Sequence, residues 1–262
     1  MDADTLLRTG IFLGVLAGLI GLESLFPRKA SVMPRLHRWL TNLSLGGLSA
    51  VAVRLMGPLT VAGAALAAEA AGFGLFRLVD LPDWAAAALI LVLLDLAMWA
   101  QHAAMHKVPL LWRMHRVHHT DRDLDVTSGL RFHPLEAAVS MLWKALVVFA
   151  LGAPVAVALA YEIALSTMAL FTHANLRLPL WLDRALRLAI VTPDMHRIHH
   201  SMIRTETDSN YGNILSLWDR MFRTYTAEPE GGQDGFTLGL EDWQDERPAR
   251  LSAAAGMPFL RK

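Results

Sequence analysis

Residues 135–172 read LEAAVSMLWKALVVFALGAPVAVALAYEIALSTMALFT, two apolar segments separated by Gly152, Ala153 and Pro154. Each segment, 135–151 and 154–172, reaches the length of about 17 to 25 residues that a bilayer-crossing helix needs. Glycine and proline end helices and favour tight turns. The stretch therefore predicts a hairpin of two membrane-spanning helices. The same junction is compatible with a bend in one long buried hairpin that does not fully cross the bilayer.

Three further apolar stretches precede this hairpin, at residues 11–26, 45–68 and 84–100. Residues 11–26 lack the basic flank and the small-residue cleavage site of a signal peptide, so we expect a retained span. Residues 45–68 are interrupted by Arg54 and by the helix-breaking Gly57–Pro58 pair. Together the five stretches predict an all-α fold, a multi-pass membrane helical bundle of about four to five spans.

The composition of the 262 residues agrees with a membrane protein. Hydrophobic residues make up 54% of the chain and charged residues 18%, against about 25% charged residues in an average globular protein. Because 24 Lys and Arg balance 24 Asp and Glu, no basic excess is present to attract nucleic acid. The absence of cysteine excludes disulfides, zinc ribbons and thiolate-held iron–sulfur clusters, so any metal is held by nitrogen or oxygen.

Basic residues gather in three of the segments between the spans. Segments 27–41, 101–134 and 174–262 hold 20 of the 24 Lys and Arg. Since cytoplasmic loops retain positive charge, we expect all three segments in the cytoplasm, where they would form a histidine-rich helical cap. The predicted domains are N-terminal membrane helices (1–83), a catalytic domain (84–225) and a C-terminal cytoplasmic tail (226–262).

The eleven histidines concentrate in a few short motifs. QHAAMH carries two of them four residues apart, and MHRVHH and MHRIHH each carry three at separations of three and four. On a helix these spacings place the rings on one face. The motif residues are His102, His106, His115, His118, His119, His196, His199 and His200, and His133 and His173 lie near the ends of the predicted hairpin.

A single histidine in such a position is most often a hydrogen-bonded core or interfacial residue. The set of ten is better explained by metal binding, because neutral imidazoles gathered in one region are natural ligands of iron, zinc, copper or nickel. Two ions need about 10 to 12 ligands, which favours a dinuclear site. Haem would use at most two of the rings and a structural zinc ion four.

The order of these motifs resembles the fatty acid hydroxylase / sterol desaturase superfamily of membrane oxygen-activating enzymes. The similarity includes LLWRMHRVHHTDRDLDVTSGLRFHPLE, FTHANLRLP, LDRALRLAIVTPDMHRIHHS and NYGNILSLWDRMF, typical of its bacterial branch, and covers about residues 90–225. The resemblance implies a histidine cluster that binds two metal ions, taken to be iron. It also implies the use of dioxygen and outside electrons to hydroxylate, desaturate or cleave lipid chains.

Carried over by position, the resemblance makes the eight motif histidines and His173 ligands, and it leaves His133 open between binding a metal and orienting a ligand. Two positions depart from the family pattern. Ala103 replaces the arginine that usually follows the first histidine, and Arg223 stands where a glycine often precedes the final Thr–Tyr. Neither departure removes a ligand, but the first changes the charge next to the expected site.

Two carboxylates are candidates for roles close to the chemistry. Asp95 lies seven residues before His102, on the same helical face inside a predicted span, and we expect it to accept a hydrogen bond from a ligand ring. Asp194 directly precedes the MHRIHH motif and is the second candidate. Glu162 could act like Asp95 or pair with Lys144. The alternative for Asp95 is a structural ion pair with Arg54.

The leading functional hypothesis is a di-iron oxidoreductase that acts on a lipid with dioxygen. The chain has no G-x-G-x-x-G motif, iron–sulfur spacing or haem site, so electrons must come from a separate donor, a cytochrome b5-like protein, a ferredoxin or a reductase. The runner-up is a dizinc membrane hydrolase of lipid esters or amides, because histidine binds both metals. A non-catalytic metal-binding protein would not need so many paired ligands.

Overall fold

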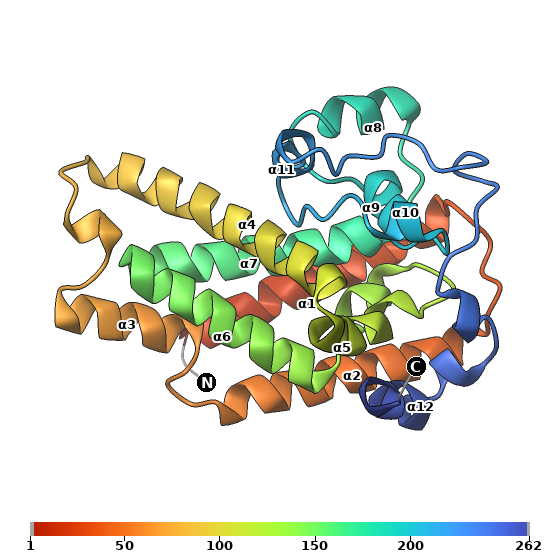
Figure 1. The fold of residues 1–262 in the computed structure, drawn as a ribbon, viewed down its shortest axis with the longest axis horizontal. Helices are drawn as coiled ribbons and strands as arrows, with labels where there is room; N and C mark the ends of the chain where they lie inside the picture. Colours follow the sequence, from red (N-terminus) through yellow and green to blue (C-terminus); the bar gives the residue numbers. More distant parts are fainter. Residues whose placement is uncertain (1–2, 261–262) are drawn as a thin grey trace.

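The computed structural model describes residues 3–260, and the regular elements in this range are helices. Five long helices run along the molecule (Figure 1): α1 (Ala3–Leu25), α2 (Arg35–Leu55), α4 (Asp83–Lys107), α6 (Pro134–Leu151) and α7 (Val155–His173). All of these except α2 are long and apolar enough to cross a membrane. The predicted all-α, multi-pass membrane bundle is therefore confirmed, with four candidate spans.

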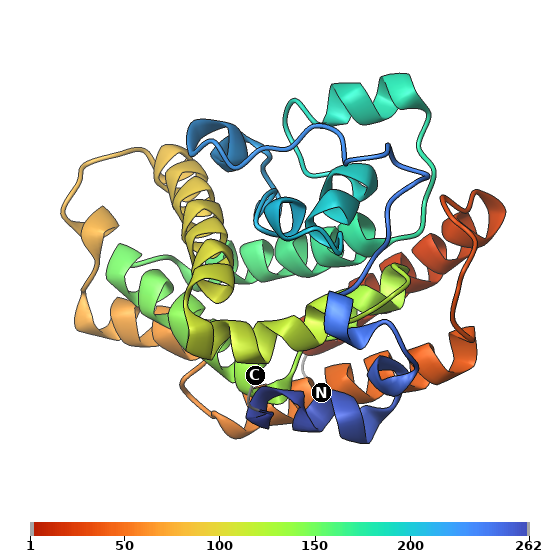
Figure 2. The same ribbon diagram turned by 45° about the vertical axis from the view of Figure 1, so that its right-hand side comes forward.

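Short helices gather at one end of this bundle, on the right in Figure 1, whereas α3 (Val61–Ala71) and η1 (Leu75–Arg77) lie at the opposite end. Figure 2 shows the same separation after a turn of 45°. The elements at the first end are α5 (Pro109–His119), η2 (Val126–Leu130), α8 (Leu180–Leu186), α9 (Pro193–His199), α10 (Arg204–Thr207), α11 (Leu217–Met221), η3 (Glu241–Trp243), η4 (Arg247–Ala249), α12 (Leu251–Gly256) and η5 (Met257–Phe259).

The α6–α7 hairpin turns where the sequence predicts it. Gly152 ends α6 in the left-handed region at φ 67°, and α7 starts directly after Pro154. Gly152 also touches the loop before η1, because a Cβ on Gly152 would come within 2.8 Å of the Phe73 carbonyl oxygen. Gly74, with φ 130°, is equally confined, since its Cβ would lie 2.2 Å from the Gly152 Cα. Two glycines thus let the hairpin turn pack closely against η1.

The prediction of a single span over residues 45–68 is wrong. The chain forms α2 up to Leu55, turns through Gly57 at φ 60°, and starts α3 at Val61, where the Thr60 side chain accepts a hydrogen bond from Gly63 N. Proline cannot continue a helix, and the Thr60 cap begins a new one. α3 has eleven residues, about 16 Å, which is too short to cross a bilayer.

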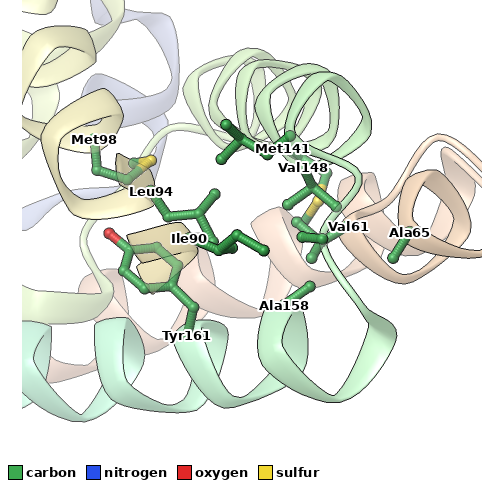
Figure 3. Close-up of a cluster of buried hydrophobic side chains, with 11 residues drawn as sticks. Val61, Ala65, Ile90, Leu94, Met98, Met141, Val148, Ala158 and Tyr161 are labelled. Carbon is green, nitrogen blue, oxygen red and sulfur yellow. The ribbon is translucent and has the colours of Figure 1, made fainter. Parts of the chain in front are cut away.

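The apolar core of the bundle joins α3, α4, α6 and α7 (Figure 3). Ile90 and Leu94 of α4 meet Val148 of α6 and Ala158 of α7, all of them essentially buried. Tyr161 of α7 directs its hydroxyl toward α4, as Figure 3 shows. This packing fixes the relative positions of the helices whose other ends carry histidines.

The C-terminal part of the chain packs onto the end of the bundle that carries the short helices. Trp243, Ala254 and Met257 are buried against Leu45 of α2 and Val117 of α5. The segment predicted as a tail thus covers the outer side of α5 up to residue 260, the last that the structure describes.

Candidate metal centre

The nine histidines predicted as ligands meet at the end of the bundle that carries the short helices. They come from the last turns of α4 and α7, from α5, and from α9 with the residue that follows it. Their ring nitrogens form two groups, in each of which one nitrogen per residue lies within 4.8 Å of every other. The five-histidine group is His102, His106, His115, His119 and His199, and the four-histidine group is His118, His173, His196 and His200.

The two groups share the same short helices. His118 and His119 are adjacent on α5 but belong to different groups, and so do His199 and His200 at the end of α9. Consecutive residues of a helix point about 100° apart, so each adjacent pair directs one ring to each group. The two candidate sites are therefore neighbours that α5 and α9 build together.

Backbone carbonyls fix the orientation of three rings, each through a hydrogen bond that Nδ1 donates. A neutral imidazole has one N–H, so these rings present an Nε2 lone pair to their group. Metal-binding histidines in proteins are usually held in this way. The pairs are His102 with Tyr211 O (2.8 Å), His199 with Ser209 O (2.7 Å) and His173 with Ala169 O (2.6 Å).

The Nε2 atoms lie close enough together to share an ion. In the five-histidine group, His102 Nε2 is 3.0 Å from His199 Nε2 and 3.2 Å from His115 Nε2. Because Nδ1 carries the proton in both His102 and His199, their Nε2 atoms cannot donate and their lone pairs face one another. A cation between the two Nε2 atoms would stabilise this arrangement. Ligands about 2.1 Å from one ion and at right angles to each other are about 3 Å apart, which matches these distances.

The four-histidine group has the same spacing. His173 Nε2 lies 3.0 Å from His118 Nε2 and 3.0 Å from His196 Nε2, and His196 Nε2 is 3.2 Å from His200 Nε2. All four rings are buried. The donor set of each group thus fits one transition-metal ion held by imidazole nitrogens.

Burial keeps the rings of the short helices neutral. It holds the pKa of His118, His119, His196 and His200 well below the usual histidine range, and neighbouring rings lower the pKa further. Burial likewise lowers the pKa of His199 to about 3. Neutral rings keep the lone pairs that a metal ion requires, so these side chains need no deprotonation near neutral pH.

Two carboxylates that the sequence analysis did not select contact the five-histidine group. His115 Nδ1 lies 2.6 Å from Glu136 Oε1, and His106 Nδ1 lies 3.3 Å from Asp208 Oδ1. Glu136 is buried in the first turn of α6. The rule that an acid within an apolar span needs a partner, which selected Asp95, would also have selected Glu136, because Glu136 belongs to the predicted span 135–151.

The predicted contact between Asp95 and a ligand ring is wrong. Asp95 accepts hydrogen bonds from Trp218 Nε1 (2.8 Å), Leu215 N (3.1 Å) and the Tyr161 hydroxyl (3.3 Å). It does not pair with Arg54 either, because Arg54 is exposed at the end of α2. The face of α4 that carries Asp95 packs against α7 and the loop before α11, so the carboxylate ties these elements together.

Asp194 and Glu162 also form ion pairs instead of contacts to ligand rings. Asp194 accepts from Arg28 Nε at 3.0 and 3.1 Å, which joins α9 to the segment after α1. Glu162 pairs with Lys144 at 2.9 Å, the alternative that the sequence analysis gave, and additionally with Arg8 at 3.1 Å. Because Asp194 belongs to the first turn of α9, this ion pair holds the histidine-bearing helix in place.

The two remaining histidines lie outside both groups. His133 Nδ1 accepts a hydrogen bond from Leu135 N, and its Nε2 lies 3.2 Å from the Ala255 carbonyl oxygen, to which it donates. His133 therefore caps α6 and binds α12. His37 is exposed on α2.

A buried polar network supports the loop that follows α5. Arg38 of α2 forms two hydrogen bonds with Asp121, at 2.7 and 2.9 Å, and one with Asp125 at 2.8 Å. The Arg38 guanidinium holds the pKa of the Asp121 carboxyl well below its usual range. Because Asp121 follows His119 by two residues, the charge pair anchors the C-terminal end of α5.

A second buried carboxylate, Asp219 of α11, holds the loop whose carbonyl orients His102. Asp219 accepts from Tyr211 N and Gly212 N, both at 2.9 Å, and from Trp99 Nε1 at 3.0 Å. Burial raises the pKa of Asp219. This carboxylate thus connects α4 to the Tyr211 carbonyl, a link that the sequence did not indicate.

A cavity of about 330 Å³ reaches the histidines from inside the bundle. His102, His115, His118, His173 and His196 line one end. Side chains and backbone of α1, α2, α4, α6 and α7 form its largely apolar walls, among them Phe12, Val53, Met98, Met141 and Leu165. Such a space suits a hydrocarbon chain whose end or middle lies beside the two groups of rings.

Comparison with known proteins places these features in a family. The family model of the fatty acid hydroxylases matches residues 87–224. Ornithine lipid hydroxylase OlsE of Rhizobium tropici is 31% identical over 53% of this chain and 41% of its own length. Human alkylglycerol monooxygenase is 28% identical over 55% of this chain and 31% of its own length.

The aligned part of this chain thus spans less than half of either relative. No solved structure matches the chain significantly. The family model nevertheless covers more than half of the sequence and includes the nine histidines. The chain therefore belongs to the fatty acid hydroxylase family.

Proposed function

We propose that this protein is a membrane-bound di-iron oxidoreductase that uses dioxygen and external electrons to hydroxylate or desaturate a C–H bond of a lipid. The observation that carries the proposal is the pair of buried histidine groups at the end of an apolar cavity. The relatives support it, since one is named a lipid hydroxylase and the other a monooxygenase.

The number of nitrogens in each group favours iron over zinc. Structural zinc takes four ligands, and catalytic zinc usually takes three protein ligands. The five-histidine group offers more donors than either arrangement needs. An ion that accepts six ligands would keep one position free there and two in the four-histidine group. Iron bound by neutral imidazoles supplies the dioxygen chemistry that oxidation of a C–H bond requires.

The side chains around the groups would hold the ligands in place. Tyr211, Ser209 and Ala169 carbonyls keep the Nδ1 protons of three rings away from the metal side. Glu136 does the same for His115 and adds a negative charge beside the five-histidine group. These contacts orient the ligands before an ion binds.

The cavity would position the lipid and keep bulk water away from the reacting carbon. Its walls are largely apolar, but Gln101 Oε1 and Asn213 Nδ2 line it, are buried and have no hydrogen-bond partner. Gln101 directly precedes His102, and Asn213 follows Tyr211 by two residues. The two unpaired atoms would therefore bind a polar group of the substrate close to the carbon that reacts.

The sequence supports the proposed partners and topology. A separate electron donor, a cytochrome b5-like protein, a ferredoxin or a reductase, would reduce the site. We place the site on the cytoplasmic face because 20 of 24 basic residues lie in segments 27–41, 101–134 and 174–262. Reporter fusions after residues 120 and 240 should both be cytoplasmic. Fusions on opposite sides would contradict this orientation.

The direct test measures metal content and oxygen chemistry on the same gently purified protein. We expect about two iron ions per chain, together with oxygen uptake and an oxidised lipid when a reductase system is supplied. A double variant, His199→Ala with His200→Ala, should abolish the oxygen uptake and the oxidised lipid in cells with intact electron supply. The His37→Ala variant should retain both activities. Two zinc ions with ester hydrolysis and no oxygen uptake would instead support a hydrolase, and saturation at one ion would exclude the dinuclear model.

A further inference from the structure

A second hollow, of about 290 Å³, lies between α1 and α7. Its lining includes Arg8 and Phe12 of α1 and Glu162 and Ser166 of α7. Phe12 and Ser166 also line the cavity that reaches the histidines. The two spaces are therefore neighbours that share Phe12 and Ser166 in their walls.

The second hollow reaches the outer surface of the bundle. Thr9 on α1 and Ser166 on α7 are both exposed. Because α1 and α7 are two of the four candidate spans, this surface faces lipid when the protein is in a membrane. This position gives a lipid in the bilayer a lateral route into the hollow between α1 and α7, without passing through water.

A charged cluster lies between this hollow and the cavity that reaches the histidines, called the inner cavity below. Arg8 and Glu162 line the hollow, but Lys144 does not. One carboxylate, Glu162, pairs with two cations, Lys144 at 2.9 Å and Arg8 at 3.1 Å. Lys144 instead lines the inner cavity. Charges within a membrane are costly unless they are partnered, and among the side chains that the structure describes this cluster has one positive charge in excess. An anionic group would complete it.

A purely structural ion pair would not need Arg8. The Lys144–Glu162 pair alone is neutral and joins α6 to α7, with both side chains largely buried. Arg8 adds the excess charge from α1, and its side chain is 41% exposed. The geometry therefore offers a cation at the mouth of the hollow and a second one in the wall of the inner cavity.

The charged cluster lies well away from the metal centre. Lys144 follows Glu136, the partner of His115, by eight residues of α6, which is about 12 Å along the helix. Glu162 precedes His173 by eleven residues of α7, about 16 Å. An extended hydrocarbon chain can bridge this separation inside the inner cavity.

We propose that the hollow between α1 and α7 is a lateral portal and head-group site for a lipid with an anionic head, a carboxylate or a phosphate. The head group binds Arg8 and Lys144, and the chain passes Phe12 into the inner cavity toward the histidines. This inference rests on the proposed function for its direction of travel, but the binding itself does not require metal.

The test measures binding of three amphiphiles with the same chain to the full-length protein in nanodiscs of neutral phosphatidylcholine. The probes are oleate, oleoyl lysophosphatidate and oleyl alcohol, which carry a carboxylate, a phosphate and a neutral head. We expect at least one anion to bind about tenfold more tightly than the alcohol, as one charge-assisted hydrogen bond allows. The tighter anion identifies the head group.

Arg8→Gln should remove most of this preference, because the Lys144–Glu162 pair that remains is neutral. Arg77→Gln, which changes an exposed arginine outside the hollow, is the matched control and should keep it. Equal affinity of the wild type for all three probes, or a preference that survives Arg8→Gln, would overturn the proposal.

A second variant tests the path of the chain. Phe12→Trp should weaken the binding of oleate but leave that of octanoate, whose short chain stays in the outer hollow, nearly unchanged. Equal effects on both acids, or none, would show that the chain does not pass Phe12. Since these readouts need neither iron nor turnover, a failed portal and a failed di-iron assignment give different results.

Discussion

The two histidine groups differ in how their rings are held. In the five-histidine group, four of the five rings have an Nδ1 partner, two carbonyls and two carboxylates. In the four-histidine group only His173 has such a partner. The Nδ1 atoms of His118, His196 and His200 are buried without a hydrogen bond.

This difference indicates two ways of building a metal site. Hydrogen bonds at Nδ1 orient a ring in advance and raise its basicity, and their loss typically costs about 10- to 100-fold in metal affinity. The five-histidine group is therefore organised before an ion binds. The rings of the four-histidine group depend more on the ion itself and on the packing of α5, α7 and α9.

Removing a ligand should have the largest effect. His199→Ala and His200→Ala each take one nitrogen from a different group, and we expect product formation to fall to background in both. Metal analysis should show a larger loss for His200→Ala, because its group has four ligands and fewer supporting hydrogen bonds. His37→Ala is the exposed control, and a His37→Ala protein without metal would contradict the assignment.

Stepwise loading tests the comparison directly. Titration of iron(II) into metal-free protein should show two binding phases. The affinity of the first phase, at the five-histidine group, should exceed that of the second by about 10- to 100-fold. His115→Ala should remove the tight phase and His118→Ala the weak one. If His118→Ala removes the tight phase instead, the contrast between the groups is wrong.

Glu136→Gln isolates one support of the five-histidine group. The amide keeps the shape of the side chain but removes the charge that His115 contacts, so the tight phase should weaken by up to about 100-fold and approach the weak one. The weak phase should stay unchanged. The control is Glu69→Gln, an exposed acid on α3 that should alter neither phase.

The smallest effect is expected at Asp208. Its contact to His106 is 3.3 Å long, and its side chain is 19% exposed and shared with Lys107 and Arg204. Partly exposed pairs contribute about 0 to 1 kcal/mol, so Asp208→Asn should change the affinity of the tight phase by less than about fivefold. An effect as large as that of Glu136→Gln would mean that charge matters more than distance at this site.

Local patterns in the sequence were sufficient for the outline of the site. Helical spacing selects the same face for His115, His118 and His119. The resemblance to the family then made nine histidines ligands, His173 among them, and these nine converge. The apolar stretches gave the four candidate spans and also a fifth, over residues 45–68, that does not form. There the Gly57–Pro58 break and the Thr60 cap outweighed the apolar composition.

Local patterns did not predict the hydrogen-bond partners that come from distant parts of the chain. Spacing places Asp95 on the face of His102, but tertiary packing turns that carboxylate to Trp218 and brings Glu136 to His115. Both choices depend on which helices lie side by side, and the separations of 123 and 21 residues carry no local signal.

The sequence by itself determined four of the apolar spans and the shared helical face of the histidines within each motif, because helical periodicity and hydrophobicity act over a few turns of one chain segment. Only the tertiary structure decided the division of nine rings into groups of five and four, since the first group joins residues from α4, α5 and α9, and the second joins residues from α5, α7 and the end of α9. It also decided which buried carboxylates contact ligand rings and which hold helices together. The physical reason is that buried polar atoms must find partners wherever packing brings donors and acceptors within about 3 Å.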